Sequence, residues 1–257
     1  MQIFGVSLGS FATLVLAANL SAQSTAPTWV TEILPPNAKI IETANVNTGG
    51  RVGRILVLWM LDPHRVVRRE VGGGGCSDWV YGDHWYGPAR LSLLNSTTRK
   101  IINTIEIHGM YEGAQDPEHG FPIPFLVRNG SYYVPQAEKI PEVKSGKEGV
   151  PKLLNLRDLT GEGVAGQFVL FEYEACAISL TTVVGYSPHT DRAVQFEVET
   201  PLDGGRRTVT SWVEQVFAYP PSPPGRWDFT WEPGHGADGS VHERVSFDRT
   251  RQLFVRK

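Results

Sequence analysis

Residues 54–61, Arg-Ile-Leu-Val-Leu-Trp-Met-Leu, form a continuous apolar run after the first residue, and this run decides the fold class. Its length and its β-branched and aromatic content are typical of a strand. An uninterrupted apolar run indicates that both faces are buried. Asp62-Pro63 follows with residues that favour a turn. We therefore expect a central strand that is covered on both sides.

Short apolar runs separated by turn residues continue along the chain. Asn129-Gly130, between 123–128 and 131–134, is a strong hairpin signal. Further strands are expected at 90–94, 100–107, 167–174, 180–186, 193–199, 227–231, 241–247 and 252–256. The pattern predicts a mainly β (α+β) fold of antiparallel meander sheets, either sandwich-like or similar to part of a propeller.

Three of the expected turns share one arrangement. A strand ends on an apolar residue, an Asn, Ser or Asp follows, and a basic residue precedes the next strand. The instances run from Asn95 to Arg99, from Ser187 to Arg192 and from Asp248 to Arg251. Asx and Ser side chains accept hydrogen bonds from nearby backbone and so start turns. Because the spacing to the basic residue varies by one, we interpret the pattern as a meander and not as a counted repeat.

One segment has a helical period. The apolar residues spaced at i, i+3, i+4, i+7 and i+8 are Val209, Trp212, Val213, Val216 and Phe217. Thr208 is a suitable N-cap, and Pro220-Pro221 would end the helix. We expect one short amphipathic helix near 208–218.

Composition limits the function classes. The chain has 257 residues with 24 Lys+Arg and 27 Asp+Glu, which gives a formal net charge of -3. This balance argues against a general nucleic-acid binder, because such proteins concentrate positive charge. The 41% hydrophobic content argues against a disordered chain. Two cysteines are too few for a four-cysteine zinc site.

Residues 1–22 contain no Asp, Glu, Lys or Arg, and their apolar stretch runs roughly from Phe11 to Ala18. A bilayer span needs about 20 apolar residues, so this stretch suits the core of a signal peptide. We predict a signal peptide over 1–22 and a single β-rich extracytoplasmic domain over 23–257, periplasmic or secreted, with no transmembrane segment. The alternative is a buried N-terminal helix.

Export favours oxidation of the two cysteines, Cys76 and Cys176. A bridge between them would close a loop of about 100 residues and stabilise the fold by up to roughly 4–5 kcal/mol. We predict this disulfide, with two free thiols as the alternative. The bridge would tie the segment after Cys76 to the strand expected at 167–174, and so bring two candidate sites into one neighbourhood.

The first candidate site is Asp158-Leu159-Thr160-Gly161-Glu162-Gly163. Oxygen side chains at positions 1, 3 and 5 with Gly at position 6 can wrap a hard cation such as Ca²⁺. The segment resembles the calcium loop of integrin-type FG-GAP repeats and related β-propeller modules. The resemblance implies a Ca²⁺ site made of Asp158, Thr160, Glu162 and the carbonyl of Val164. Ca²⁺ prefers six to eight ligands, so we favour a tight glycine-containing turn and keep Ca²⁺ as the alternative; no other cofactor is indicated.

The second candidate site follows Gly72–Gly75 and combines aromatic and polar residues. They are Asp78, Trp79, Tyr81, Asp83, His84, Trp85 and Tyr86. Sugars stack on aromatic rings, and carboxylates and imidazoles bond their hydroxyl groups, so this composition fits a ligand site. Aromatic residues also supply much of a small β core, and that structural interpretation is the favoured one. His242 and the other histidines lack the i, i+4 spacing that places two imidazoles on one face of a metal-binding helix.

Several sequence segments resemble those of a family of secreted bacterial β-rich proteins. They lie at 54–61, 87–95, 101–105, 158–163 and 174–176. The resemblance implies export and a β fold, and it implies no activity. We therefore expect a non-enzymatic exported binding or structural protein with an extracytoplasmic ligand or protein partner. The alternative is an extracytoplasmic hydrolase that acts on glycans with carboxylates such as Asp78 and Asp83.

Overall fold

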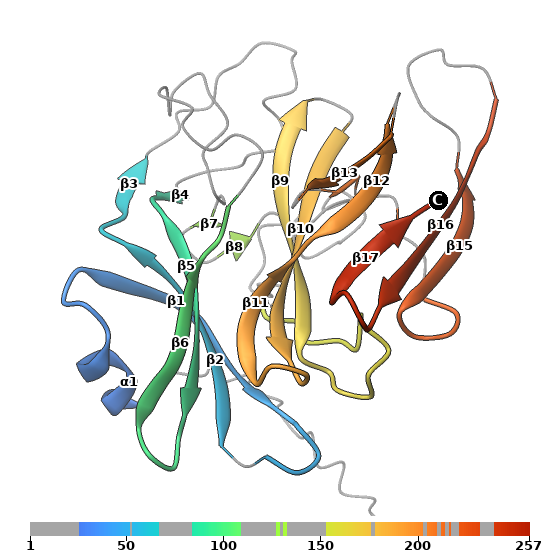
Figure 1. Ribbon diagram of the computed structural model, residues 1–257. Coiled ribbons are helices and arrows are strands. Elements are labelled where there is room, and N and C mark those ends of the chain that lie inside the picture. Colours follow the sequence, from blue (N-terminus) through green and yellow to red (C-terminus); the bar gives the residue numbers. More distant parts are fainter. Residues whose placement is uncertain are drawn as a thin grey trace, which may run out of the picture.

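The computed structural model describes residues 26–51, 53–66, 84–108, 127–128, 131–132, 153–175, 178–202, 205–209, 212–213, 216, 221–231 and 239–257. The fold is mainly β, as the sequence predicts, and most strand pairs are antiparallel. Figure 1 shows three larger sheets side by side, which we call sheets A, C and D from left to right. A small fourth sheet, B, is drawn near the upper end of sheet A.

Sheet A contains the predicted central strand. Its order is β1 (Ala38–Val46), β2 (Arg54–Leu61), β5 (Ala89–Asn95) and β6 (Lys100–Glu106). All six residues from Ile55 to Met60 are buried, so the prediction for 54–61 is confirmed. One face of β2 packs against the short helix α1 (Thr28–Ile33), which the sequence analysis did not predict, and the other faces sheet C.

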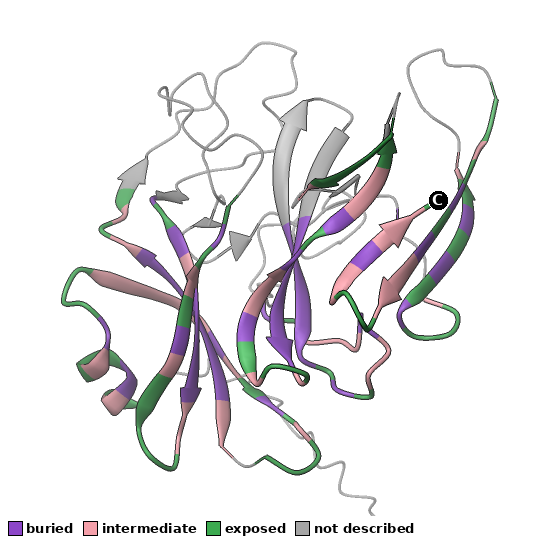
Figure 2. Ribbon diagram, viewed as in Figure 1, coloured by how far each residue is buried: buried purple, intermediate pink, exposed green. Residues whose placement is uncertain are grey.

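Sheet C is the middle layer. Strand β10 (Ile178–Ser187) pairs along one edge with β9 (Gln167–Ala175) and along the other with β11 (Arg192–Phe196) and β14 (Trp212–Val213). Successive side chains of a strand point to opposite faces. Phe168 and Leu170 accordingly pack toward sheet A, whereas Val169 packs toward sheet D. Figure 2 shows the described parts of β9 and β10 as buried.

Sheet D has the order β13 (Gly205–Val209), β12 (Val198–Leu202), β17 (Leu253–Arg256), β16 (Val241–Asp248) and β15 (Arg226–Trp231). The β12–β17 pair is parallel, and the others are antiparallel. Trp227, Val245 and Phe254 are buried against sheet C. Figure 2 shows buried and exposed residues alternating along β15, so one face of this sheet is open to solvent.

Sheet B contains β3 (His64–Val66), β4 (His84–Tyr86), β7 (Val127–Arg128) and β8 (Ser131–Tyr132). Arg128 pairs with Ser131, and Val127 pairs with Tyr132. This register leaves a two-residue connection, so the hairpin predicted around Asn129-Gly130 is confirmed.

The three predicted Asx and Ser turns are hairpins, and they are more regular than the sequence indicated. The residue four positions after the turn's first residue has a left-handed backbone in each case. These residues are Arg99 (φ 52°), Asp191 (φ 55°) and Gln252 (φ 56°). In the first hairpin the Asn95 Oδ1 accepts hydrogen bonds from the amides of Thr97 (2.9 Å) and Thr98 (3.1 Å). The spacing to the basic residue varies and the turns form a meander, as predicted; the feature that is constant is the left-handed residue.

The helix expected near 208–218 is wrong over its first turns. Val209 lies in β13 opposite Val198, and Trp212 lies in β14 opposite Thr181. Val and Thr favour strands because their branched side chains fit a pleated surface. Pairing with strands distant in the sequence outweighed the apolar spacing, and Val209 and Val216 reach the same core from separate segments.

Candidate binding surface

The aromatic candidate site is only partly described. His84, Trp85 and Tyr86 form β4, whose backbone pairs with β3 and β7. Asp78, Trp79, Tyr81 and Asp83 lie outside the described residues, as do Cys76 and Cys176. The predicted ligand site and the predicted disulfide therefore remain predictions.

The Asp158 turn is described in full. The Asp158 Oδ1 accepts hydrogen bonds from the amides of Gly161 (2.8 Å) and Glu162 (3.1 Å), and Oδ2 accepts one from Gly163 (2.8 Å). The side chain of Thr160 is buried, and Val164 belongs to the core between sheets A and C. A carboxylate that closes its own loop through backbone amides is what the turn interpretation predicts.

The same turn is held against sheet D. Gly161 and Gly225 both have positive φ, and a Cβ on Gly225 would lie 2.5 Å from the carbonyl oxygen of Thr160. Arg249, from the β16–β17 hairpin, donates a hydrogen bond to the Gly161 carbonyl. The turn thus joins the entry to β9 with two loops of sheet D. Within the described residues no group of three or more His, Cys, Asp or Glu side chains is arranged to hold a metal ion.

The described parts of the two predicted sites lie at different places in the fold. In Figure 1 the loop that contains residues 158–163 lies below β9, whereas β4 lies near the top of sheet A. The shared neighbourhood expected from a bridge depends on Cys76 and Cys176, which lie outside the described residues, and it stays a prediction.

Side-chain amides join sheets A and C. Asn103 on β6 donates to the carbonyl of Ala193 (2.9 Å) and accepts from its amide (2.9 Å). Gln195 on β11 makes the same pair of bonds with the backbone of His108 (2.6 and 2.9 Å). Each amide takes the place of a strand residue in the ladder, so the two sheet edges are tied without a shared strand.

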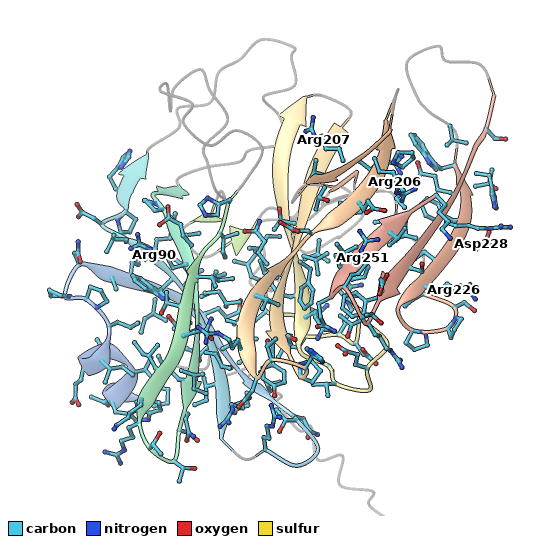
Figure 3. All side chains as sticks on the ribbon, in the orientation of Figure 1. Arg90, Arg206, Arg207, Arg226, Asp228 and Arg251 are labelled. Carbon is cyan, nitrogen blue, oxygen red and sulfur yellow. The ribbon has the colours of Figure 1, made fainter. Side chains whose placement is uncertain are left out.

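The exposed side of sheet D carries a set of polar side chains among the described residues. Because side chains alternate along strands, the face opposite Trp227 and Phe254 presents a set of polar groups, which we call the polar face. Its members are Glu199, Arg206, Thr208, Arg226, Asp228, Thr230, His242, Arg244 and Lys257, with Arg251 reaching it from the β16–β17 hairpin. Figure 3 labels Arg206, Arg226, Asp228 and Arg251 on sheet D.

Two arginines of the polar face share one carboxylate. The Nε of Arg206 and a terminal nitrogen of Arg251 bond the two oxygens of Glu199, and Arg206 also donates to the Arg256 carbonyl (2.8 Å). The hydrogen bonds from Arg251 and then Arg206 lower the pKa of Glu199. The Glu199 side chain is only 15% exposed, but those of Arg206 and Arg251 are 39% and 46% exposed. The cluster therefore shows solvent two guanidiniums and one net positive charge.

A second cluster spans β15 and β16. The His242 Nε2 lies 3.2 Å from the Asp228 Oδ1, and its Nδ1 lies 3.2 Å from the Thr230 hydroxyl. The Nε of Arg244 donates to the Asp228 Oδ2 at 2.9 Å. About half of the Asp228 and His242 side chains is exposed. The cluster can therefore donate hydrogen bonds to a ligand and accept hydrogen bonds from it. The sequence analysis noted only that His242 lacks the spacing of a helical metal site, since its pairing with Asp228 depends on strand register.

A comparison of the chain with protein-family models, with curated proteins and with solved structures found no match. The resemblances noted above therefore rest on their residues alone. Within the described ranges, no helix combines the length and hydrophobicity that a membrane crossing requires.

Proposed function

We propose that the chain is a non-enzymatic exported β-rich protein that binds an extracytoplasmic ligand through the polar face of sheet D. The observation that carries the proposal is the exposure of this face, on which guanidinium, imidazole, hydroxyl and carboxylate groups alternate with buried core residues along β15 and β16. Sheets A and C, by contrast, are each packed on both faces.

The use of the carboxylates supports binding over hydrolysis. Glycoside hydrolases generally need two carboxyl groups that face the substrate. The carboxylates of Asp158, Asp191 and Glu199 each accept hydrogen bonds from several N–H groups of the protein and hold turns or strands together. The alternative, a hydrolase that acts on glycans, depends on Asp78 and Asp83.

Export is part of the proposal and has its own test. Expression of the complete sequence in a bacterium with separate periplasmic and culture fractions should yield a product that begins at Gln23, read by mass spectrometry. Thiol titration of this product, denatured without reductant, should find no free sulfhydryl if Cys76 and Cys176 are bridged. Retention of residues 1–22 in the cytoplasm would contradict export.

Retention on glycans tests the function itself. The exported chain is passed over immobilised peptidoglycan and over neutral and acidic polysaccharides, and the eluate is analysed for released sugar. We expect retention on at least one matrix without release of reducing ends. Release of sugar would support the hydrolase, and no retention on any matrix would contradict a glycan-binding role.

A further inference from the structure

We propose that the polar face of sheet D binds the carboxylate groups of an acidic polysaccharide, with Arg206 and Arg251 as its anchor. The inference rests on the proposed function and names its ligand class. Three steps carry it: the charge of the face, the geometry of its guanidiniums, and the kind of surface that surrounds them.

The charge of the face favours an anionic ligand. Arg206 and Arg251 share Glu199, so the three groups together keep one positive charge. Arg226 and Lys257 are exposed, and neither has an ion pair among the described residues. Arg244 balances Asp228. Asp248 lies near Arg251 and offsets that charge, so the excess of positive charge on the face comes from Arg226 and Lys257.

The guanidiniums are held in place with donors to spare. Arg251 contacts Glu199 through one terminal nitrogen, and Arg206 is fixed by Glu199 and by the Arg256 carbonyl. An arginine has five N–H donors in a planar fork that matches a carboxylate. Because Glu199 and the backbone already position the two side chains, a ligand carboxylate would lose little side-chain entropy on binding.

The surroundings favour a polysaccharide over a protein partner. Protein interfaces are centred on buried aromatic and large apolar residues. Among the described residues the exposed large apolar side chain is Ile101, which lies on β6 of sheet A and not on this face. One row of the polar face crosses the five strands through Thr208, Glu199, Val255, Ser246 and Arg226. Such a row is about 19 Å long, which suits an extended hydrophilic chain with repeated carboxylates.

The test compares substitutions with opposite expected signs. Binding of the exported chain to polygalacturonate is measured by calorimetry at several salt concentrations. Arg206→Gln combined with Arg251→Gln should weaken binding about tenfold or more, since two charge-assisted contacts are lost. Glu199→Gln keeps a side-chain oxygen that can accept a hydrogen bond from the arginines and also leaves Arg206 bonded to the Arg256 carbonyl. It removes a competing negative charge, so it should tighten binding by roughly threefold. A merely structural role for the cluster would give the two variants the same sign.

Arg207→Gln is the matched control. Arg207 neighbours Arg206 in β13 and is exposed, but it pairs with Thr200 and so projects from the opposite face. Its loss should leave the affinity within about twofold if the binding face is the polar one. Thermal melts of all variants separate loss of binding from loss of folding.

Several outcomes would overturn the inference. Equal affinity of wild type and the double arginine variant would do so, as would weaker binding by the folded Glu199→Gln variant. If poly-glutamate bound as tightly as polygalacturonate, the face would recognise carboxylates of any polymer, and the assignment to a polysaccharide would be wrong. Retention on neutral glycans or peptidoglycan, without binding to polygalacturonate, would refute this inference and leave the proposed function standing. Failure on every matrix would refute both.

Discussion

Arg54 and Asp191, 137 positions apart in the sequence, form a bidentate ion pair. The Nε of Arg54 donates to the Oδ1 of Asp191 at 2.9 Å, and a terminal nitrogen donates to Oδ2 at 2.7 Å. The Tyr186 hydroxyl adds a third hydrogen bond at 3.0 Å. The pair fixes the first residue of β2 to the turn between β10 and β11, and it therefore links sheet A to sheet C.

This pair predicts a pH dependence of stability. The hydrogen bond from Arg54 is the main cause that lowers the pKa of Asp191 to about 2 from 3.8. Because the pKa of Asp191 is lower in the folded state, its carboxylate stabilises the fold at any pH above its pKa in the unfolded chain. This contribution is lost as the pH falls from about 4 to about 2. After solvent screening we expect it to be on the order of 1 kcal/mol. Urea melts of wild type and Asp191→Asn across this range measure the difference.

The control for that measurement is Glu106→Gln, which breaks the more exposed pair with Arg90. This variant should change stability by less than about 0.5 kcal/mol. Asp191→Asn should flatten the dependence on pH between about 4 and 2. Parallel curves for wild type and Asp191→Asn would contradict the role of the pair.

The contact between the Asp158 turn and sheet D predicts unequal effects of two glycine substitutions. Gly225→Ala combines a φ of 78° with a Cβ 2.5 Å from the Thr160 carbonyl oxygen. Gly163→Ala has a similar φ of 81° but open space around the Cβ. We expect a loss of about 2–4 kcal/mol for Gly225→Ala and about 1 kcal/mol for Gly163→Ala. Similar losses in chemical denaturation would show that the two segments are not pressed together.

The hydrogen bonds of Asp158 predict independence from calcium. Because three backbone amides already bind the carboxylate, the melting temperature should be the same with excess chelator and with added Ca²⁺. Asp158→Ala should lower stability by roughly 1–3 kcal/mol in both conditions, since the amides lose their acceptor. A melting temperature that rises with Ca²⁺ in wild type and not in Asp158→Ala would restore the metal interpretation.

The left-handed residue of the β5–β6 hairpin predicts opposite signs for two substitutions. Arg99 has a φ of 52°, which costs a non-glycine residue roughly 1–2 kcal/mol. Glycine removes that cost, but it makes the unfolded chain more flexible, which lowers stability by about 0.4–1 kcal/mol. Arg99→Gly should therefore raise stability slightly, and the β-branched Arg99→Val should lower it. Thermal melts check the order, and greater stability of the valine variant would contradict it.

The parts of the fold that were predictable are those set by local chemistry. The run at 54–61 indicated a buried strand because its apolar content allows no exposed face. Asn95 and Asp248 indicated turns because their side chains bond the backbone two and three residues ahead. The Asp158 turn was predictable for the same reason.

The parts that were missed depend on long-range pairing. The spacing of Val209 and Trp212 matched a helix, and only the partners Val198 and Thr181 make these segments strands. The polar face could not be predicted, since Glu199 meets Arg251 across 52 residues through a parallel register. The alternation of polar and apolar residues along 226–231 was visible in the sequence, but it does not indicate which strand pairs with this segment.

The place of β17 between β12 and β16 sets an order for assembly during synthesis. β12–β13 and β15–β16 are two hairpins with no ladder to each other except through β17. Isolated two-stranded hairpins are at best marginal in water. Because residues 253–256 leave the ribosome after both hairpins, sheet D stays divided until translation passes them, and sheets A and C can acquire structure first.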